Sequence, residues 1–201
     1  MLHFDILQKL FDIGCIKFGS FRLKSGDNCP FDIDLRLVLS YPSLLEDLAQ
    51  ALWQKIAPIP KDHLCGIPYT AFSIATYLST KHHIPMLLKR IDLKEHSSKQ
   101  PIEGFYKPQE KCLILEDVIT SGHSILETIQ NLQDLELITS AVAVLIDREQ
   151  GGAMAIEKQG FHLHAVMTIS QICAQLKALG KITPTDLEKT KRFVEHHQVE
   201  I

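Results

Sequence analysis

Two adjacent acids, Glu116 and Asp117, are followed within a few residues by a run of hydroxyl-bearing side chains. They lie in the stretch LILEDVITSGHSILET (113–128), where apolar residues lead directly into the acids. Neighbouring residues of a strand point to opposite faces, so these carboxylates are poorly placed to flank one bond as a glycosidase pair. They suit a diol better, because each carboxylate can accept a hydrogen bond from one hydroxyl of a ribose.

The segment that follows the acids, Thr120 to Ser124, offers hydroxyl donors, a glycine and the start of a predicted helix. This combination suits a phosphate group. The Walker A and Rossmann glycine patterns are both missing, so we interpret the acids and the segment together as a site for ribose 5-phosphate. A purely structural alternative is that Ser124 and Glu127, which have the spacing of a capping box, only start the helix.

The composition is that of a globular protein without a marked charge bias. The chain has 201 residues, 45% hydrophobic and 22% charged residues and a net charge of −3, which predicts one domain and gives no reason to expect nucleic-acid binding. Its five scattered cysteines favour a reducing compartment over disulfides or a zinc site. No apolar run approaches membrane-spanning length, and we expect no membrane partner and a cytoplasmic protein.

Apolar strands alternate with amphipathic helices along the chain, which predicts an α/β fold with a mainly parallel sheet. The expected strands lie near 16–26, 31–36, 64–70, 85–90, 112–116, 139–147 and 161–167. Helices are expected near the N-terminus, from Pro42, after Thr70, around Ile125–Ile129, near 170–179 and from Pro184. A long polar segment after Arg90 has no clear periodicity, and loops of this length in compact domains are usually functional lids or linkers.

The stretch LILEDVITSG resembles the signature of type I phosphoribosyltransferases, which bind phosphoribosyl pyrophosphate (PRPP). Further stretches resemble orotate phosphoribosyltransferase, in the form found as the N-terminal half of bifunctional UMP synthase: KFGSFRLKSG, DLR (34–36), GIPYTA, IPMLLKR, EGFYKP and LIDREQGG. The resemblance runs from Phe18 to beyond Ile169. Because a decarboxylase-sized second domain does not fit in this length, we expect the single-function form.

This resemblance implies a single domain, 1–201, with the type I phosphoribosyltransferase fold: a central, mainly parallel sheet flanked by helices, with a small hood. Residues 1–40 and C-terminal elements would form the hood, 60–170 the PRPP-binding core and 91–106 a mobile catalytic loop. The implied reaction joins orotate to PRPP with Mg²⁺ present, giving orotidine 5'-monophosphate and pyrophosphate. The implied assembly is a homodimer with shared active sites.

The resemblance also assigns roles to individual residues. Lys94, Glu116 and Asp117 would be catalytic, and Asp32, Ile33, Thr120 and Arg148 would bind orotate. The PRPP-binding set would be Lys24, Tyr69, Thr70, Arg90, Lys94, His96, Glu116, Asp117, Val118, Ile119, Thr120, Ser121, Gly122, His123 and Ser124. No side chain is expected to bind the metal directly, because Mg²⁺ would be held mainly through PRPP.

Two residues of the expected catalytic loop depart from the family's pattern. The family usually has a lysine where this chain has Ile91, and it tends to have a glycine at Ser97. Losing one charge-assisted contact should slow catalysis roughly 10- to 200-fold, and Lys89 is expected to compensate in part. These departures leave two alternatives to the enzyme: a PRPP- or nucleotide-sensing regulator on the same fold, and a phosphoribosyltransferase for another base.

Overall fold

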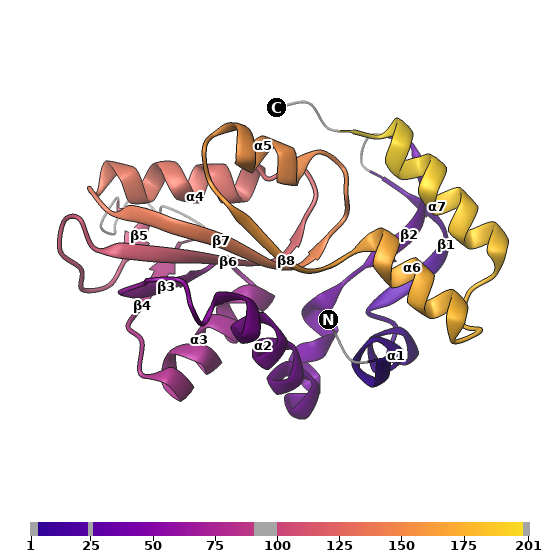
Figure 1. The fold of residues 1–201 in the computed structure, drawn as a ribbon, viewed down its shortest axis with the longest axis horizontal. Coiled ribbons are helices and arrows are strands. Elements are labelled where there is room, and N and C mark those ends of the chain that lie inside the picture. The colour runs from indigo at the N-terminus through magenta and orange to yellow at the C-terminus, as the bar shows by residue number, and fades with distance from the viewer. Residues whose placement is uncertain (1–3, 24–25, 91–99, 199–201) are drawn as a thin grey trace.

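A six-stranded sheet forms the centre of the computed structural model, which describes residues 4–23, 26–90 and 100–198 (Figure 1). The strand order is β5-β4-β3-β6-β7-β8, and all neighbours pair in parallel except β4 and β5. The strands are β3 (His63–Gly66), β4 (Met86–Lys89), β5 (Ile102–Glu103), β6 (Lys111–Ile119), β7 (Ile138–Asp147) and β8 (Leu163–Thr168). The predicted α/β class with a mainly parallel sheet is therefore confirmed.

Helices cover both faces of this sheet. In Figure 1, α4 (His123–Asp134) and α5 (Gly152–Lys158) lie on one face, and α2 (Pro42–Ile56) and α3 (Thr70–His82) lie on the other. The start of α2 at Pro42 agrees with the sequence, because proline is well suited to the first turn of a helix. The seven-residue α5 was not predicted from the sequence.

Alternate side chains of β6 enter two separate hydrophobic cores. Leu113 and Leu115 belong to the core on the side of α2 and α3, whereas Cys112 and Ile114 belong to the core on the side of α4 and α5. The same alternation continues into the acids, so Glu116 points towards α4 and Asp117 points to the opposite face.

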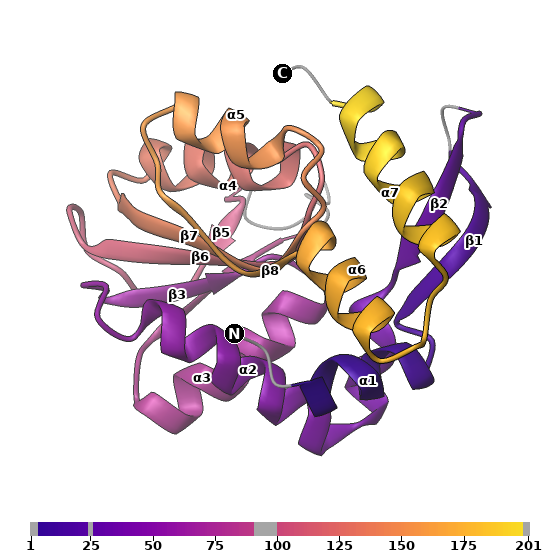
Figure 2. The same ribbon diagram turned by 45° about the vertical axis from the view of Figure 1, so that its right-hand side comes forward.

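A second, two-stranded antiparallel sheet stands beside the large one (Figure 2). Its strands β1 (Ile16–Arg22) and β2 (Asn28–Ile33) lie next to α1 (Phe4–Asp12), α6 (Ile169–Ala178) and α7 (Pro184–His196). The Phe31 ring of β2 packs edge-on against Phe193 of α7, with ring centroids 6.0 Å apart. The first hairpin and the last helix, far apart in sequence, therefore form one unit.

Several sequence predictions of element boundaries were wrong. The strand expected over 31–36 ends at Ile33, and the 3-10 helix η1 (Leu35–Ser40) follows, because the Asp34 side chain caps it by accepting a 3.0 Å hydrogen bond from the Arg36 amide. Strand β6 continues to Ile119 instead of ending at Glu116, because β7 pairs with it along this whole length. The polar segment after Arg90 contains β5, whose Ile102 is buried against the sheet.

Within the described residues, no helix is both long enough and apolar enough to cross a membrane.

Candidate active site

The chain changes direction between β3 and β6, which are neighbours in the middle of the sheet. From β3 the chain continues outward to β4, and from β6 it continues to β7 and β8 on the other side. Open α/β sheets bind ligands at such a switch point, outside the carboxyl ends of the strands. Strand β3 pairs with β6 only as far as Leu115, so Glu116 and Asp117 lie at the position where the crevice opens.

The loop after β3 turns sharply into α3 at Gly66. A Cβ atom on Gly66 would lie 2.6 Å from the Ala71 carbonyl oxygen and 2.7 Å from the Phe72 Cα, so only glycine allows this close return. The turn leaves Tyr69 63% exposed, and the peptide bond between Pro68 and Tyr69 is cis. Thr70 is buried instead, and its hydroxyl has no hydrogen-bond partner among the described residues.

The two acids have different environments. Glu116 is 6% exposed and accepts hydrogen bonds from the Ser124 hydroxyl (2.9 Å) and the Asp117 amide (3.1 Å). Burial, followed by the negative charge of Asp117, raises the pKa of Glu116 to about 9, so this carboxyl group is neutral at pH 7. Asp117 is half-buried and faces a cavity, and its carboxylate accepts a 2.8 Å hydrogen bond from the Val118 amide. Of the pair, only Asp117 lines the cavity.

The segment 120–124 forms the junction between β6 and α4, as the phosphate interpretation requires. Gly122 precedes the helix with a φ of +83°, and the exposed His123 is the first helical residue. The capping-box alternative is wrong: the Ser124 hydroxyl donates to Glu116, and Glu127 pairs with Lys89 at 2.8 Å. Both side chains, Ser124 and Glu127, interact with residues outside α4, so helix capping alone does not explain the segment.

Other members of the expected PRPP set surround this junction. Val118 lines the cavity, Ile119 is buried in the core on the α4 side, and Thr120 and Ser121 are half-buried. The Thr120 carbonyl accepts a 2.9 Å hydrogen bond from the Gly152 amide, which ties this loop to the loop after β7.

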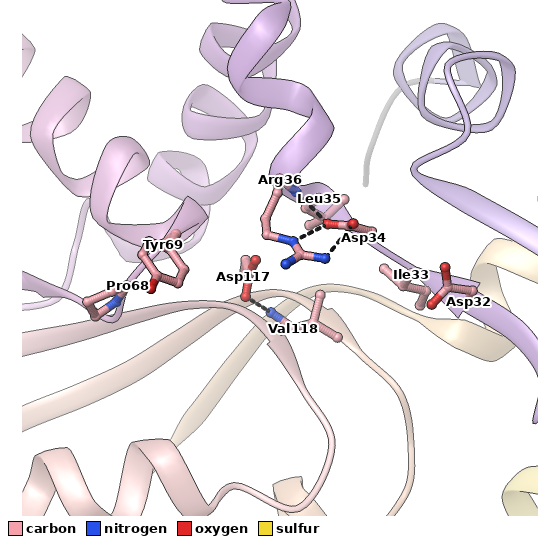
Figure 3. Close-up of a pocket in the computed structure, with 9 residues that line it drawn as sticks. All are labelled: Asp32, Ile33, Asp34, Leu35, Arg36, Pro68, Tyr69, Asp117 and Val118. Atoms are coloured by element: carbon pink, nitrogen blue, oxygen red, sulfur yellow. Dashed lines mark hydrogen bonds and ion pairs between the residues drawn. The ribbon is translucent and has the colours of Figure 1, made fainter. Parts of the chain in front are cut away.

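A cavity of about 320 Å³ lies between η1, the loop after β3 and β6 (Figure 3). Its lining residues are Asp32, Ile33, Asp34, Leu35, Arg36, Pro68, Tyr69, Asp117 and Val118. The expected orotate-contacting residues Asp32 and Ile33 and the expected PRPP-contacting residues Tyr69, Asp117 and Val118 are therefore brought together. Asp34 and Arg36 also line the cavity; they belong to the DLR stretch of the family resemblance, but no functional role was expected for either of them.

Arg148, the expected orotate-binding arginine, follows the end of β7 and lies over β2. Its guanidinium carbon is 4.7 Å from the centre of the Phe31 ring, and its Nε donates a 2.8 Å hydrogen bond to Gln150. Burial lowers its pKa, while the nearby Cys29 and Asp32 act in the opposite direction. The structure thus brings Arg148 close to the strand that carries Asp32, although it does not line the cavity.

The expected catalytic loop is only partly described. Lys24, Ile91, Lys94, His96 and Ser97 lie outside the described residues. Arg90 is half-buried, and its Nη1 donates a 2.9 Å hydrogen bond to Glu103 across the β4–β5 pair.

The expectation that Lys89 would compensate for the missing loop lysine was wrong. Its side chain is 9% exposed and its ammonium group pairs with Glu127 and donates to the Ser124 carbonyl, so it is already engaged on the α4 side.

Comparisons with known proteins agree with this geometry. The phosphoribosyl transferase domain model matches residues 38–171. Uridine 5'-monophosphate synthase of Bos taurus is 42% identical over 195 residues, covering 96% of this chain and 41% of that protein. Orotate phosphoribosyltransferase of Chlamydia caviae is 37% identical, covering 92% of this chain and 91% of that protein. The solved structure of Leishmania donovani UMP synthase has a TM-score of 0.85 and 28% identity, over 96% of this chain and 42% of that one.

The fold and the crevice at the switch point, together with this match, define a phosphoribosyltransferase. Within that class, the relatives at 37–42% identity show that the chain belongs to the orotate phosphoribosyltransferase family. It spans less than half the length of the Bos taurus and Leishmania donovani UMP synthases, and nearly the full length of the chlamydial protein.

Proposed function

We propose that this chain transfers the 5-phosphoribosyl group of PRPP to orotate. The observation that carries the proposal is the position of Asp117, which faces the cavity at the switch point while the 120–124 loop begins a few residues beyond it. Family membership supplies the identity of the two substrates. The bond between a ring nitrogen of orotate and C1 of the ribose forms as the bond from C1 to the pyrophosphate oxygen breaks. The electron pair leaves with pyrophosphate, and the ring nitrogen releases its proton.

Asp117 and Glu116 have different roles at the ribose in this proposal. The reacting sugar gains positive charge as pyrophosphate departs, and a fixed carboxylate beside it lowers the free energy of that transition state. Asp117 is the carboxylate of the pair that faces the cavity, whereas burial raises the pKa of Glu116 to about 9. The neutral Glu116 carboxyl group accepts hydrogen bonds from the Ser124 hydroxyl and the Asp117 amide. It thereby fixes the end of β6 relative to the 120–124 loop.

Phosphate and base are held by different loops. The 5-phosphate would bind the amides and hydroxyls from Thr120 to Ser124 at the start of α4, where the helix dipole favours an anion. The carboxylate of orotate would bind Arg148, whose planar guanidinium can donate two parallel hydrogen bonds to it. Both groups would thus be fixed relative to Asp117, and positioning of this kind is a large part of catalysis when no nucleophilic side chain is used.

Magnesium fits the residues present. Mg²⁺ keeps several waters and takes only one or two protein carboxylates together with substrate phosphates. Asp117 and Asp32 face the cavity, whereas the third carboxylate, Asp34, is engaged by Arg36, and the described residues contain no group of three or more metal-ligating side chains. When bound, the ion would neutralise charge on the departing pyrophosphate.

The test is to follow orotate absorbance with PRPP and Mg²⁺, with adenine, hypoxanthine and uracil as competing bases. We expect loss of the orotate signal only, and Asp117→Asn should slow it by at least about 10-fold. Binding of PRPP without turnover of any base would favour a PRPP- or nucleotide-sensing regulator. Turnover of another base alone would favour a phosphoribosyltransferase for that base. The expected homodimer is measured by light scattering, and full activity of a monomer would contradict shared sites.

A further inference from the structure

Among the described residues that line the cavity at the switch point, one is cationic: Arg36, for which neither the sequence patterns nor the family resemblance provides a role. We infer that Arg36 binds the pyrophosphate group of PRPP and that Asp34 holds its guanidinium in place for this task. The inference rests on the proposed function, because it names a further residue of the same site.

The first argument is charge. Apart from Arg36, the charged residues that line the cavity are the carboxylates Asp32, Asp34 and Asp117, which would repel a polyphosphate. Arg36 lies within electrostatic range of Asp32 and Asp117 as well as Asp34. Mg²⁺ and this guanidinium are therefore the cations that can make the described part of the cavity acceptable to pyrophosphate.

The second argument is the number of donors that remain. Asp34 accepts from Arg36 Nε at 2.8 Å and from Nη2 at 2.7 Å, which fixes the plane of the guanidinium. Among the described residues, Nη1 has no hydrogen-bond partner, and a guanidinium carries five N–H donors. Figure 3 shows the group extended from η1 over Asp117, so the remaining donors lie on the cavity side.

The third argument is position. Figure 3 shows Asp117 between Arg36 and the loop that carries Pro68 and Tyr69, with the Arg36 guanidinium beside Asp117. The 5-phosphate is assigned to the loop after β6 and the carboxylate of orotate to Arg148. The substrate group left to occupy the cavity that Tyr69, Asp117 and Arg36 line together is the pyrophosphate on C1.

A structural role for the Asp34–Arg36 pair explains less. The Arg36 side chain is 68% exposed, and solvent-exposed ion pairs add little to stability. Asp34 already caps η1 by accepting a hydrogen bond from the Arg36 amide, which requires no particular side chain at position 36. The pair therefore suits a guanidinium held ready for an anion better than one needed for folding.

The experiment measures binding of pyrophosphate with Mg²⁺ by calorimetry, and steady-state kinetics, for Arg36→Gln, Arg36→Lys and Asp34→Asn. The matched control is Arg192→Gln, because Arg192 is an exposed arginine paired with Glu188 at 2.9 Å on α7, outside this cavity. We expect Arg36→Gln to weaken pyrophosphate binding and raise KM for PRPP about 10- to 100-fold, with Tm and KM for orotate unchanged. Arg36→Lys should weaken pyrophosphate binding less, because it keeps the positive charge. Asp34→Asn should also weaken it less, because the guanidinium remains although its ion pair with Asp34 is lost.

The outcomes separate this inference from the proposed function. If the wild-type chain turns over orotate and Arg36→Gln binds pyrophosphate as tightly as Arg192→Gln, the inference is wrong and the function stands. If the wild-type chain turns over no base but Arg36→Gln still loses pyrophosphate affinity, the anion site stands and the function is wrong. A fall in Tm that accounts for the lost binding would assign Arg36 to structure and overturn the inference.

Discussion

The amide of Gly152 donates a 2.9 Å hydrogen bond to the carbonyl of Thr120, so the loop after β7 is fastened to the loop after β6. The contact has no room for a side chain, because a Cβ on Gly152 would lie 2.5 Å from that carbonyl oxygen and 2.7 Å from Ile119 Cγ1. The proposed phosphate site and the loop that begins with the proposed orotate-binding Arg148 therefore share one backbone contact.

Gly152→Ala should impair both halves of the proposed site. We expect overpacking to cost about 1–3 kcal/mol of unfolding free energy and to raise KM for both PRPP and orotate. Urea denaturation and steady-state kinetics measure the two effects. Gly19→Ala is the matched control, since its Cβ would make an ordinary 3.5 Å contact with Phe21. Equal behaviour of the two variants would contradict the shared contact.

Glu116 should make the protein less stable as the pH rises. Its pKa is about 9 in the folded protein against 4.5 ordinarily, so the unfolded chain loses this proton at lower pH than the folded protein does. The free energy of unfolding therefore falls between about pH 4.5 and 9 on account of this group.

Glu116→Gln removes that dependence, because an amide has no proton to lose in this range. At pH 7 we expect the variant to be more stable than the wild type by up to about 3 kcal/mol, with the difference growing towards pH 9. Denaturation midpoints from pH 5 to 9 measure it, with Glu188→Gln on α7 as the control. Parallel curves for the wild type and Glu116→Gln would show that Glu116 is ionised in the folded protein.

Arg148→Lys should weaken binding of orotate and leave binding of PRPP unchanged. A lysine keeps the charge but loses the planar pair of donors and the Nε bond to Gln150. We expect KM for orotate to rise about 10-fold or more, with KM for PRPP within about 2-fold of the wild type. Initial rates with each substrate varied in turn provide the measurement. The assignment fails if KM for PRPP rises as much as KM for orotate.

Ile91→Lys should raise kcat/KM for PRPP. The substitution restores the lysine that the family usually has after the arginine at position 90, and Lys89 does not replace it because its ammonium group is paired with Glu127. The gain expected from one charge-assisted contact is roughly 10-fold or more. An unchanged or lower value would show that the loop geometry of this chain differs from that of the family.

The sequence predicted the order of the main strands and helices because their apolar periodicities are long and their boundaries carry strong signals, such as Pro42 at the start of α2. It also predicted that the acid pair and the 120–124 segment lie where a strand passes into a helix, because these residues are contiguous in the chain. It failed where tertiary partners decide: Ser124 and Glu127 match a capping box by spacing, yet Glu116 and Lys89 bind them instead. Interactions between segments far apart in sequence leave no local signal.

The cavity shows the same limit. Arg36 reaches the cavity because β2 ends at Ile33 and Asp34 caps the 3-10 helix η1. The alternation of polar and apolar residues over 31–36 does not reveal this change from strand to helix. The two-residue β5 was missed for a similar reason, since its pairing with β4 depends on a distant edge and not on its own composition.

The chain continues from β3 towards β4 and from β6 towards β7, on opposite sides of the switch point. This arrangement affects which substitutions the site can accept. On the proposed assignments, the loop after β3 and η1 serve pyrophosphate, the loop after β7 and β2 serve the base, and β6 between them serves the ribose. Substitutions that alter the choice of base can therefore accumulate without touching the residues that hold the leaving group. The shared sugar-binding strand is then the part with the least freedom to vary, and new base specificities are most easily selected at its two flanks.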